Sequence, residues 1–268
     1  MADSKTETGL RLHLFYMIIM RRILSIVLVM ATVCAGCSAK VRQYKPEVVK
    51  QYPHDSKAYT QGLFFRDGQL YESTGQYGQS SFRIVELETG KVLRKLDFGA
   101  KYFGEGSVMM GDKMYMLTWT NKVAFVYDAA SLKYLQTYSY PREGWGITTD
   151  GKQLYTSDGS SSIYVLDEEF RLQRTIKVTL DGRPLRLLNE LEWIDGKIWA
   201  NIYTTDLIAI INPQSGAVEA TVDCTGLLPA KLRTADTDVL NGIAVNPADG
   251  KIYLTGKNWP KLYEIKLK

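Results

Sequence analysis

Asp195-Gly-Lys-Ile-Trp199 is one of five similar phrases in this 268-residue chain, and each phrase ends in an aromatic residue. An Asp-Gly pair between two short apolar runs is a strong β-hairpin signal, because both residues tolerate a positive φ angle. The other phrases are Asp67-Gly-Gln-Leu-Tyr71, Gly111-Asp-Lys-Met-Tyr115, Asp150-Gly-Lys-Gln-Leu-Tyr155 and Asp249-Gly-Lys-Ile-Tyr253. Consecutive final aromatics are separated by 44, 40, 44 and 54 residues. This spacing predicts five similar units, each built on a hairpin.

Each unit continues with a third predicted strand of β-branched and apolar residues, and the first four units add a fourth strand after a turn. The third strands are predicted at residues 82–87, 123–127, 162–166, 207–211 and 261–265. The fifth unit reaches the end of the chain, so residues 47–52, which precede the first unit, are predicted to supply its outer strand. Units of roughly 40–50 residues with four strands are typical of β-propellers. We therefore predict an all-β fold, a five-bladed β-propeller whose ring is closed by an N-terminal strand joining the last blade.

The N-terminal segment has a different composition. Arg21 and Arg22 precede an apolar run at residues 23–33. This run is too short to span a bilayer but has the length of a secretory signal core. It ends in Cys34-Ala-Gly-Cys37, which is similar to a bacterial lipoprotein processing site with Cys37 as the lipidated first residue, although Cys34 stands where such sites usually carry an aliphatic residue.

These features predict a signal peptide at residues 1–37 and a single propeller domain at residues 38–268. They indicate an exported protein, periplasmic or held at the cell envelope through lipid on Cys37. Ordinary signal cleavage nearby is the alternative.

Charge and cysteine content exclude other classes of protein. The chain has 33 basic and 29 acidic residues, and 29 and 27 of them remain after residues 1–37 are removed. A near-neutral balance without a basic block gives no indication of a nucleic-acid partner. Cys224 is the cysteine left in the mature chain, so no internal disulfide is expected and Cys224 is predicted to be a small core residue.

The repeat also predicts which side chains meet. Inner strands of a propeller line one channel, so equivalent positions at their starts converge on one mouth. Ten residues before each final aromatic, or twelve in the longer fifth unit, the chain has Gln61, Glu105, Trp145, Asn189 and Asn241. Four residues after each final aromatic it has Gly75, Trp119, Gly159, Tyr203 and Lys257. Aromatic walls with a few polar groups are typical of a ligand pocket; a water-filled channel lined by the same residues is the alternative.

Nine phrases within residues 44–268 resemble the plant and bacterial glutaminyl cyclases. They are Tyr59-Thr-Gln-Gly-Leu63, Ser73-Thr-Gly-Gln-Tyr-Gly-Gln-Ser-Ser81, Phe103-Gly-Glu-Gly106, Leu117-Thr-Trp119, Gly144-Trp-Gly146, Ser157-Asp-Gly-Ser160, Leu188-Asn-Glu-Leu-Glu192, Trp199-Ala-Asn-Ile-Tyr203 and Leu240-Asn-Gly242. The resemblance implies a five-bladed propeller that converts the N-terminal glutamine of peptides or proteins to pyroglutamate and releases ammonia. Residues 38–268 would then be the catalytic domain of an acyltransferase, with Gln-peptides as its partners.

The resemblance also implies residue roles. The substrate's α-amine attacks its own side-chain amide carbon, so the enzyme has to orient two groups, move a proton and stabilise an oxyanion. Glu105 matches the family's catalytic glutamate and is expected to be the general acid/base, with a pKa raised by poorly solvated surroundings. Asn189 and Lys257 match polar family positions and are expected to orient the amide and stabilise charge on its oxygen. The expected substrate-binding residues are Gln61, Phe103, Trp119, Trp145, Tyr203 and Asn241. Tyr203 stands where a tryptophan is expected in plant members.

Two other functions are compatible with the sequence. One is a non-catalytic propeller lipoprotein that binds peptides or glycans. The other is a calcium-dependent, lactonase-like hydrolase with Glu and Asn around a central ion. No metal or other cofactor is expected to be required for catalysis, although a structural calcium ion in the central channel is compatible with the sequence. The sequence Asp236-Thr-Asp238 could bind calcium together with loop carbonyl groups, but a polar loop without a metal is the favoured interpretation.

Two further expectations concern His54 and the oligomeric state. His54 is the single histidine of the mature chain and is expected to be a loop residue, which leaves catalytic triads and zinc sites without a partner. The closed ring favours a monomer that contacts a membrane through its lipid anchor alone.

Overall fold

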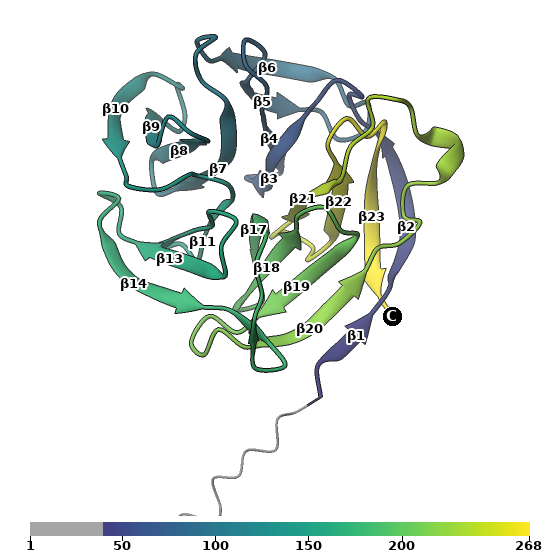
Figure 1. Ribbon diagram of the computed structural model, residues 1–268. Coiled ribbons are helices and arrows are strands. Elements are labelled where there is room, and N and C mark those ends of the chain that lie inside the picture. Colours follow the sequence, from purple (N-terminus) through teal and green to yellow (C-terminus); the bar gives the residue numbers. More distant parts are fainter. Residues whose placement is uncertain (1–39) are drawn as a thin grey trace, which may run out of the picture. The chain divides into compact units, whose positions relative to one another are not determined.

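The computed structural model describes residues 40–268, which form five antiparallel blades around a central axis (Figure 1). From the inside outwards, blade 1 consists of β3 (Thr60–Arg66), β4 (Gln69–Thr74), β5 (Ser81–Val85) and β6 (Val92–Asp97). Blade 2 consists of β7 (Gly104–Met110), β8 (Lys113–Thr118), β9 (Val123–Asp128) and β10 (Tyr134–Ser139). Blade 3 consists of β11 (Ile147–Thr149), β12 (Leu154–Thr156), β13 (Ser162–Leu166) and β14 (Leu172–Lys177). Blade 4 consists of β17 (Leu188–Ile194), β18 (Lys197–Ile202), β19 (Leu207–Ile211) and β20 (Val218–Asp223). Blade 5 contains β21 (Leu240–Val245), β22 (Ile252–Gly256) and β23 (Lys261–Leu267). The prediction of an all-β, five-bladed propeller is confirmed. The predicted signal peptide and Cys37 lie outside the described residues.

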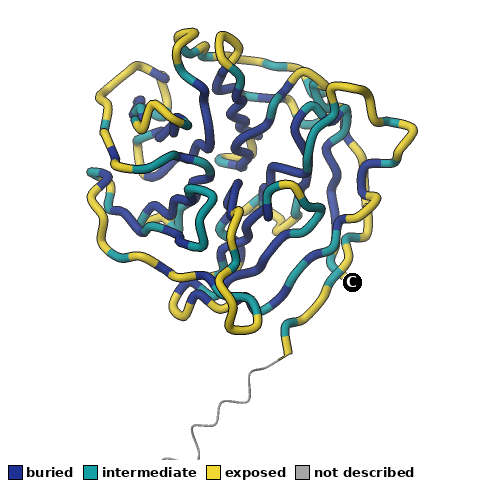
Figure 2. The backbone as a smooth tube through the Cα atoms, viewed as in Figure 1, coloured by how far each residue is buried: buried dark blue, intermediate teal, exposed yellow. Residues whose placement is uncertain are grey.

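The inner strands β3, β7, β11, β17 and β21 contact one another in sequence around the axis. Burial follows the same geometry, with dark inner strands and mostly exposed outer strands in Figure 2. All seven residues of β7 are buried, whereas β10 has no buried residue. Side chains at the start of an inner strand are therefore directed to the centre of the ring.

The repeated aromatic residues pack between neighbouring blades. The described part of the chain has five apolar clusters, one at each interface between blades. The five phrase-ending aromatics each belong to a different cluster: Tyr71, Tyr115, Tyr155, Trp199 and Tyr253. The residue that marks the repeat in the sequence is thus the one that joins each blade to the next.

The Asp-Gly turns adopt the backbone that the sequence predicts in two hairpins. Asp67 and Gly68 have φ angles of 51° and 75°, and Asp195 and Gly196 have 49° and 74°. Consecutive positive φ angles match the right-handed twist of the flanking strands, which favours a tight two-residue connection.

The N-terminal part of the described chain closes the ring. As predicted, β2 (Pro46–Pro53) completes the last blade by pairing antiparallel with β23. A strand that the repeat does not predict, β1 (Arg42–Tyr44), pairs in parallel with β20 at the outer edge of blade 4. This short polar strand has no repeat equivalent, and together with β2 it ties the outer edges of two blades.

The remaining elements are small. They are a hairpin of β15 (Thr179–Leu180) and β16 (Arg183–Pro184), and the 3₁₀ turn η1 (Ala230–Leu232). Within residues 40–268, no helix has the length and apolar character needed to cross a membrane. The outer strands β6, β10 and β14 pair on one side only, so ring closure alone does not remove every edge.

Candidate active site

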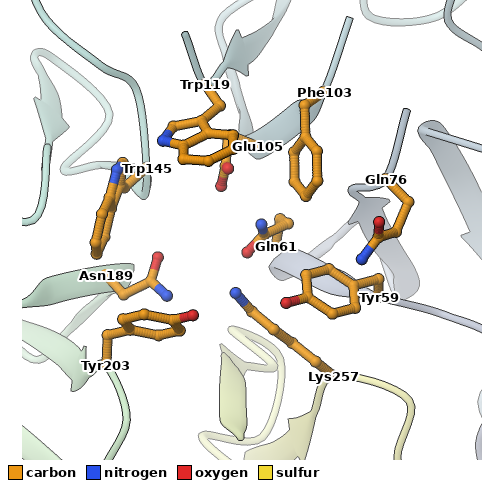
Figure 3. Close-up of a pocket in the computed structure, with 10 residues that line it drawn as sticks. All are labelled: Tyr59, Gln61, Gln76, Phe103, Glu105, Trp119, Trp145, Asn189, Tyr203 and Lys257. Atoms are coloured by element: carbon orange, nitrogen blue, oxygen red, sulfur yellow. The ribbon is translucent and has the colours of Figure 1, made fainter. Parts of the chain in front are cut away.

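The inner-strand starts and second-strand ends enclose one pocket with a volume of about 190 Å³ (Figure 3). It is lined by Tyr59, Gln61, Gln76, Phe103, Glu105, Trp119, Trp145, Asn189, Tyr203 and Lys257. Eight of these ten are among the site residues expected from the sequence, and Tyr59 and Gln76 are not. Small-molecule sites usually measure about 300–1,000 Å³, so this pocket suits a single amino-acid residue.

Glu105 lies on β7, where two glycines bring neighbouring backbone close to it. A Cβ atom on Gly104 would lie 3.0 Å from the Thr74 oxygen. A Cβ atom on Gly106 would lie 2.8 Å from both the Ile147 nitrogen and the Trp145 oxygen. Any larger residue would therefore push β7 away from its neighbours and displace the carboxylate.

The surroundings of Glu105 favour its neutral form. Its side chain is buried, and burial raises the pKa of Glu105 well above its usual range. The Lys257 ammonium opposes this shift, and the Glu143 carboxylate adds to it. Within residues 40–268, no hydrogen bond fixes the carboxylate, which faces the pocket with its bonding capacity free (Figure 3).

Lys257 extends into the pocket directly after β22. Its Nζ lies 4.8 Å from the centre of the Tyr59 ring and 4.9 Å from that of the Tyr203 ring, so the ammonium is held between two aromatic faces. Burial lowers the pKa of Lys257, while Glu105 and Asp238 oppose the shift. Tyr59 is itself fixed, because its hydroxyl donates a hydrogen bond of 2.7 Å to Oδ2 of Asp238.

The aromatic wall includes two edge-to-face pairs that contain its tryptophans. The rings of Phe103 and Trp119 lie 5.6 Å apart at 67°, and those of Trp145 and Tyr203 lie 5.5 Å apart at 80°. The Trp145 ring lies against Gly159, where a Cβ atom would come within 2.6 Å of it. The aromatic rings and the polar residues Gln61, Glu105 and Asn189 line the same pocket. This combination suits a side chain with a methylene stem and a polar end.

Comparison with known proteins identifies the family. A family model described as glutamine cyclotransferase matches residues 22–267. The chain is 42% identical over 234 residues to the Arabidopsis thaliana glutaminyl-peptide cyclotransferase, an alignment that covers 83% of this chain and 71% of the relative. The crystal structure of Myxococcus xanthus glutaminyl cyclase is similar, with a TM-score of 0.80, 33% identity, and coverage of 85% of this chain and 99% of that chain. The chain belongs to the glutamine cyclotransferase family.

In this member of the family, Asn241 does not line the pocket, contrary to its expected place among the substrate-binding residues. Its side chain is fully buried, and its Nδ2 donates hydrogen bonds to the Thr60 oxygen at 2.8 Å and to Oε1 of Gln61 at 3.2 Å. The ladder between β21 and β22 shifts register here, as the ladders at Gln61, Glu105 and Asn189 also do, so the position is equivalent and it is the hydrogen bond to Gln61 that turns the Asn241 side chain away from the cavity. Asn241 therefore supports Gln61 from behind.

Two pocket residues lie next to positions that the repeat does identify. Tyr59 precedes Gln61 by two residues at the start of the same inner strand, and Gln76 follows Gly75. Gly75 leaves room for the Phe103 ring, so the neighbouring Gln76 provides the side chain at this point of the wall. Because Gly75 has no side chain at this repeat position, the sequence could have indicated the next residue, Gln76, as the one that lines the pocket.

His54 lies in a loop, as expected, but its side chain is not that of a plain loop residue. Its ring is buried, with Nδ1 2.6 Å from the Trp259 oxygen and Nε2 3.0 Å from Oε1 of Glu72. Glu72 raises the pKa of His54 against the effect of burial, and the pKa of Glu72 is lowered in turn. His54 thus belongs to a buried ion pair, and no pattern in the sequence indicates its partner.

A calcium ion in the central channel would need oxygen ligands from the surrounding side chains. Residues 40–268 contain no group of three or more His, Cys, Asp or Glu side chains placed to hold a metal ion. In the channel, Glu190 and Glu192 accept hydrogen bonds from backbone N–H groups of Ile243 and Val245, so their oxygens are committed to the protein.

Proposed function

We propose that this chain converts the N-terminal glutamine of peptides or proteins to pyroglutamate and releases ammonia. The proposal rests on Glu105, a buried carboxylate with free hydrogen-bonding capacity in a pocket of single-residue size. The names of the family and of its relatives describe the same reaction.

The reaction needs one proton carrier and no nucleophile from the enzyme. The α-amine nitrogen forms a bond to Cδ of the glutamine side chain, and the bond between Cδ and the amide nitrogen breaks. Glu105 accepts a proton from the attacking nitrogen and delivers it to the departing nitrogen, which leaves as ammonia. A carboxyl group whose pKa is raised can both accept and release a proton near neutral pH.

Polar groups opposite Glu105 would stabilise the negative charge that forms on the amide oxygen. The Lys257 ammonium and the Asn189 amide both face the pocket (Figure 3). A cation between two aromatic faces is poorly hydrated and acts strongly on a nearby oxyanion. Gln61, held by Asn241, would orient the amine, and the rings of Phe103, Trp119 and Trp145 would hold the methylene stem.

An ammonia-release assay tests the proposal. Wild type is expected to release ammonia from a Gln-peptide well above the spontaneous rate, and Glu105→Gln is expected to lose this activity. Glu88→Gln, an exposed position paired with Lys50, is the matched control and should retain full activity. The same peptide with an acetylated N-terminus has no free amine, so ammonia from it would indicate amide hydrolysis and contradict cyclisation.

Two rival functions give different results in this assay. A propeller that only binds peptides or glycans would release no ammonia from any Gln-peptide. A calcium-dependent hydrolase would lose its activity in the presence of a chelator. We propose that no metal is required, so turnover should be unchanged after chelation.

We further propose that the protein is exported and anchored to the cell envelope through lipid on Cys37. The proposal rests on the sequence Cys34-Ala-Gly-Cys37 after an apolar signal core. Expression in a bacterial host with radiolabelled palmitate should label the wild type and leave Cys37→Ser unlabelled. Labelling of both proteins would exclude Cys37 as the lipidated residue.

A monomeric state is proposed for the propeller itself. Light scattering on the segment of residues 38–268 should give the mass of one chain. A dimer would indicate pairing through an outer blade edge.

A further inference from the structure

We propose that Glu143 is a positioning residue that holds Trp119 and Trp145 at the separation needed to grip the glutamine side chain. The proposal rests on the proposed function and adds a residue that does not line the pocket. Oε2 of Glu143 accepts hydrogen bonds from the indole nitrogens of Trp119 at 2.8 Å and Trp145 at 3.0 Å. One carboxylate oxygen thus joins two walls of the pocket.

The two tryptophans come from different blades. Trp119 follows β8 in blade 2, and Trp145 precedes β11 in blade 3. Trp119 packs against Phe103, and Trp145 packs against Tyr203 and Gly159. None of these contacts joins the two indoles to each other, whereas Glu143 binds both at their N–H edges.

The loop that carries Glu143 is itself anchored. Gly146 donates its backbone N–H to Oγ of Ser157 at 2.8 Å, and Trp145 donates its own to the Ser157 oxygen at 3.1 Å. A Cβ atom on Gly144 would lie 2.9 Å from the Thr118 oxygen, so the loop passes close to blade 2. Arg142 is directed elsewhere, 3.7 Å from the centre of the Tyr164 ring. The position of the Glu143 backbone is therefore determined by both blades that it joins.

The charge of Glu143 has a second effect, on the proton carrier. A carboxylate at this place opposes ionisation of Glu105 and contributes to its raised pKa. The other titratable groups near Glu105 are Lys257, Tyr59, Tyr140 and Tyr203. The pKa of each of these tyrosines is raised, so they stay neutral over the range in which Glu105 titrates.

Two substitutions separate geometry from charge. Glu143→Gln keeps an oxygen that can accept both indole N–H groups and removes the charge. It should leave KM near the wild-type value and move the acidic limb of kcat/KM to lower pH, because Glu105 then ionises more easily. Glu143→Ala removes the acceptor of both indole N–H groups, and KM for a Gln-peptide should rise roughly ten-fold or more, because two hydrogen bonds to a charged group are lost.

Arg142→Gln is the matched control, since it changes the adjacent loop residue without touching either indole. It should leave KM unchanged. Equal increases in KM for Glu143→Ala and Glu143→Gln, or an equal increase for Arg142→Gln, would show that the loop and not the acceptor oxygen matters, and would overturn the proposal.

A second measurement does not depend on activity. In ¹H–¹⁵N spectra of the full chain, two of the five tryptophan indole signals should shift in Glu143→Ala and stay near their wild-type positions in Glu143→Gln. Unshifted indole signals in Glu143→Ala would overturn the role of Glu143 even in an active enzyme. If wild type releases no ammonia, the proposed function fails while this spectroscopic result still decides whether Glu143 holds the two rings.

Discussion

Glu105 and Glu190 are both buried glutamates on inner strands, yet the protein surrounds them differently. Burial raises the pKa of each well above its usual range. Glu190 lies in the channel, where its oxygens accept backbone N–H groups from Leu63 at 3.3 Å and from Ile243 at 2.9 Å. Glu105 faces a pocket with no such bond. Burial and a raised pKa therefore do not by themselves indicate a catalytic acid, and unused hydrogen-bonding capacity beside a cavity is the distinguishing feature.

Glu105→Gln should give the largest effect on activity. We expect kcat to fall roughly 10²–10⁴-fold, because the proton carrier is lost. Thermal unfolding should occur at the wild-type temperature or above it, since no hydrogen bond breaks and a buried ionisable group is removed. Ammonia release and calorimetry measure the two quantities. A fall in activity that parallels a fall in stability would assign Glu105 to the same structural class as Glu190.

Lys257→Met comes next. Loss of the cation that faces the developing oxyanion should lower kcat by about 10²-fold. Lys257 also lowers the pKa of Glu105, so its removal should move the acidic limb of kcat/KM to higher pH, opposite to the shift expected for Glu143→Gln. The pH profile of residual ammonia release measures this. An unchanged acidic limb would indicate that Glu105 is not the group that titrates.

Glu190→Gln tests the channel side of the comparison. Both oxygens of Glu190 accept N–H groups, so an amide would direct its NH₂ group at one of these donors. We expect the free energy of unfolding to fall by about 1–3 kcal/mol, the cost of a buried group left unsatisfied. Activity of the folded fraction should be retained, and urea unfolding combined with the ammonia assay gives both values. Full stability with lost activity would reverse the roles assigned to the two glutamates.

The repeat makes most of this architecture predictable. Hairpin signals at regular spacing predict the five blades, and a fixed offset from the repeated aromatics identifies Glu105, Asn189 and Lys257 from the amino-acid sequence alone. The offset works because each repeated aromatic pairs with the residue three positions after the site residue, which places equivalent residues at one level of the channel. It fails for Asn241, whose place in the ladder is equivalent but whose side chain turns behind Gln61 and donates a hydrogen bond to it.

Features without a repeat equivalent are not predictable in this way. Glu143 lies in a connecting loop, and its partners Trp119 and Trp145 come from two blades, so no spacing in the sequence links the three. The pairing of His54 with Glu72 likewise joins residues from the closing segment and blade 1. Such contacts depend on tertiary packing that a single sequence does not encode as a pattern.

Glu192 provides the smallest and most specific test, because it combines features of both glutamates. It is buried in the channel, and its oxygens accept the Val245 N–H at 3.0 Å and the Thr148 hydroxyl at 3.3 Å. Burial raises the pKa of Glu192 to about 8, against the effect of these bonds. In the unfolded chain the group ionises near its ordinary pKa of 4.5. Between these values the unfolded chain binds fewer protons than the folded protein, so the contribution of Glu192 to stability declines as the pH rises.

The decline should begin near pH 4.5 and be complete above about pH 8. Glu192→Gln resembles the protonated group, since its oxygen can accept from Val245 while its NH₂ faces the Thr148 hydroxyl. This variant should therefore lose less stability than wild type between these pH values, as measured by urea unfolding at pH 5, 7 and 9. Parallel pH dependences in the two proteins would mean that Glu192 is ionised throughout. The channel carboxylates would then be charged acceptors of backbone N–H groups, and the contrast with Glu105 would lie in protonation as well as in hydrogen bonding.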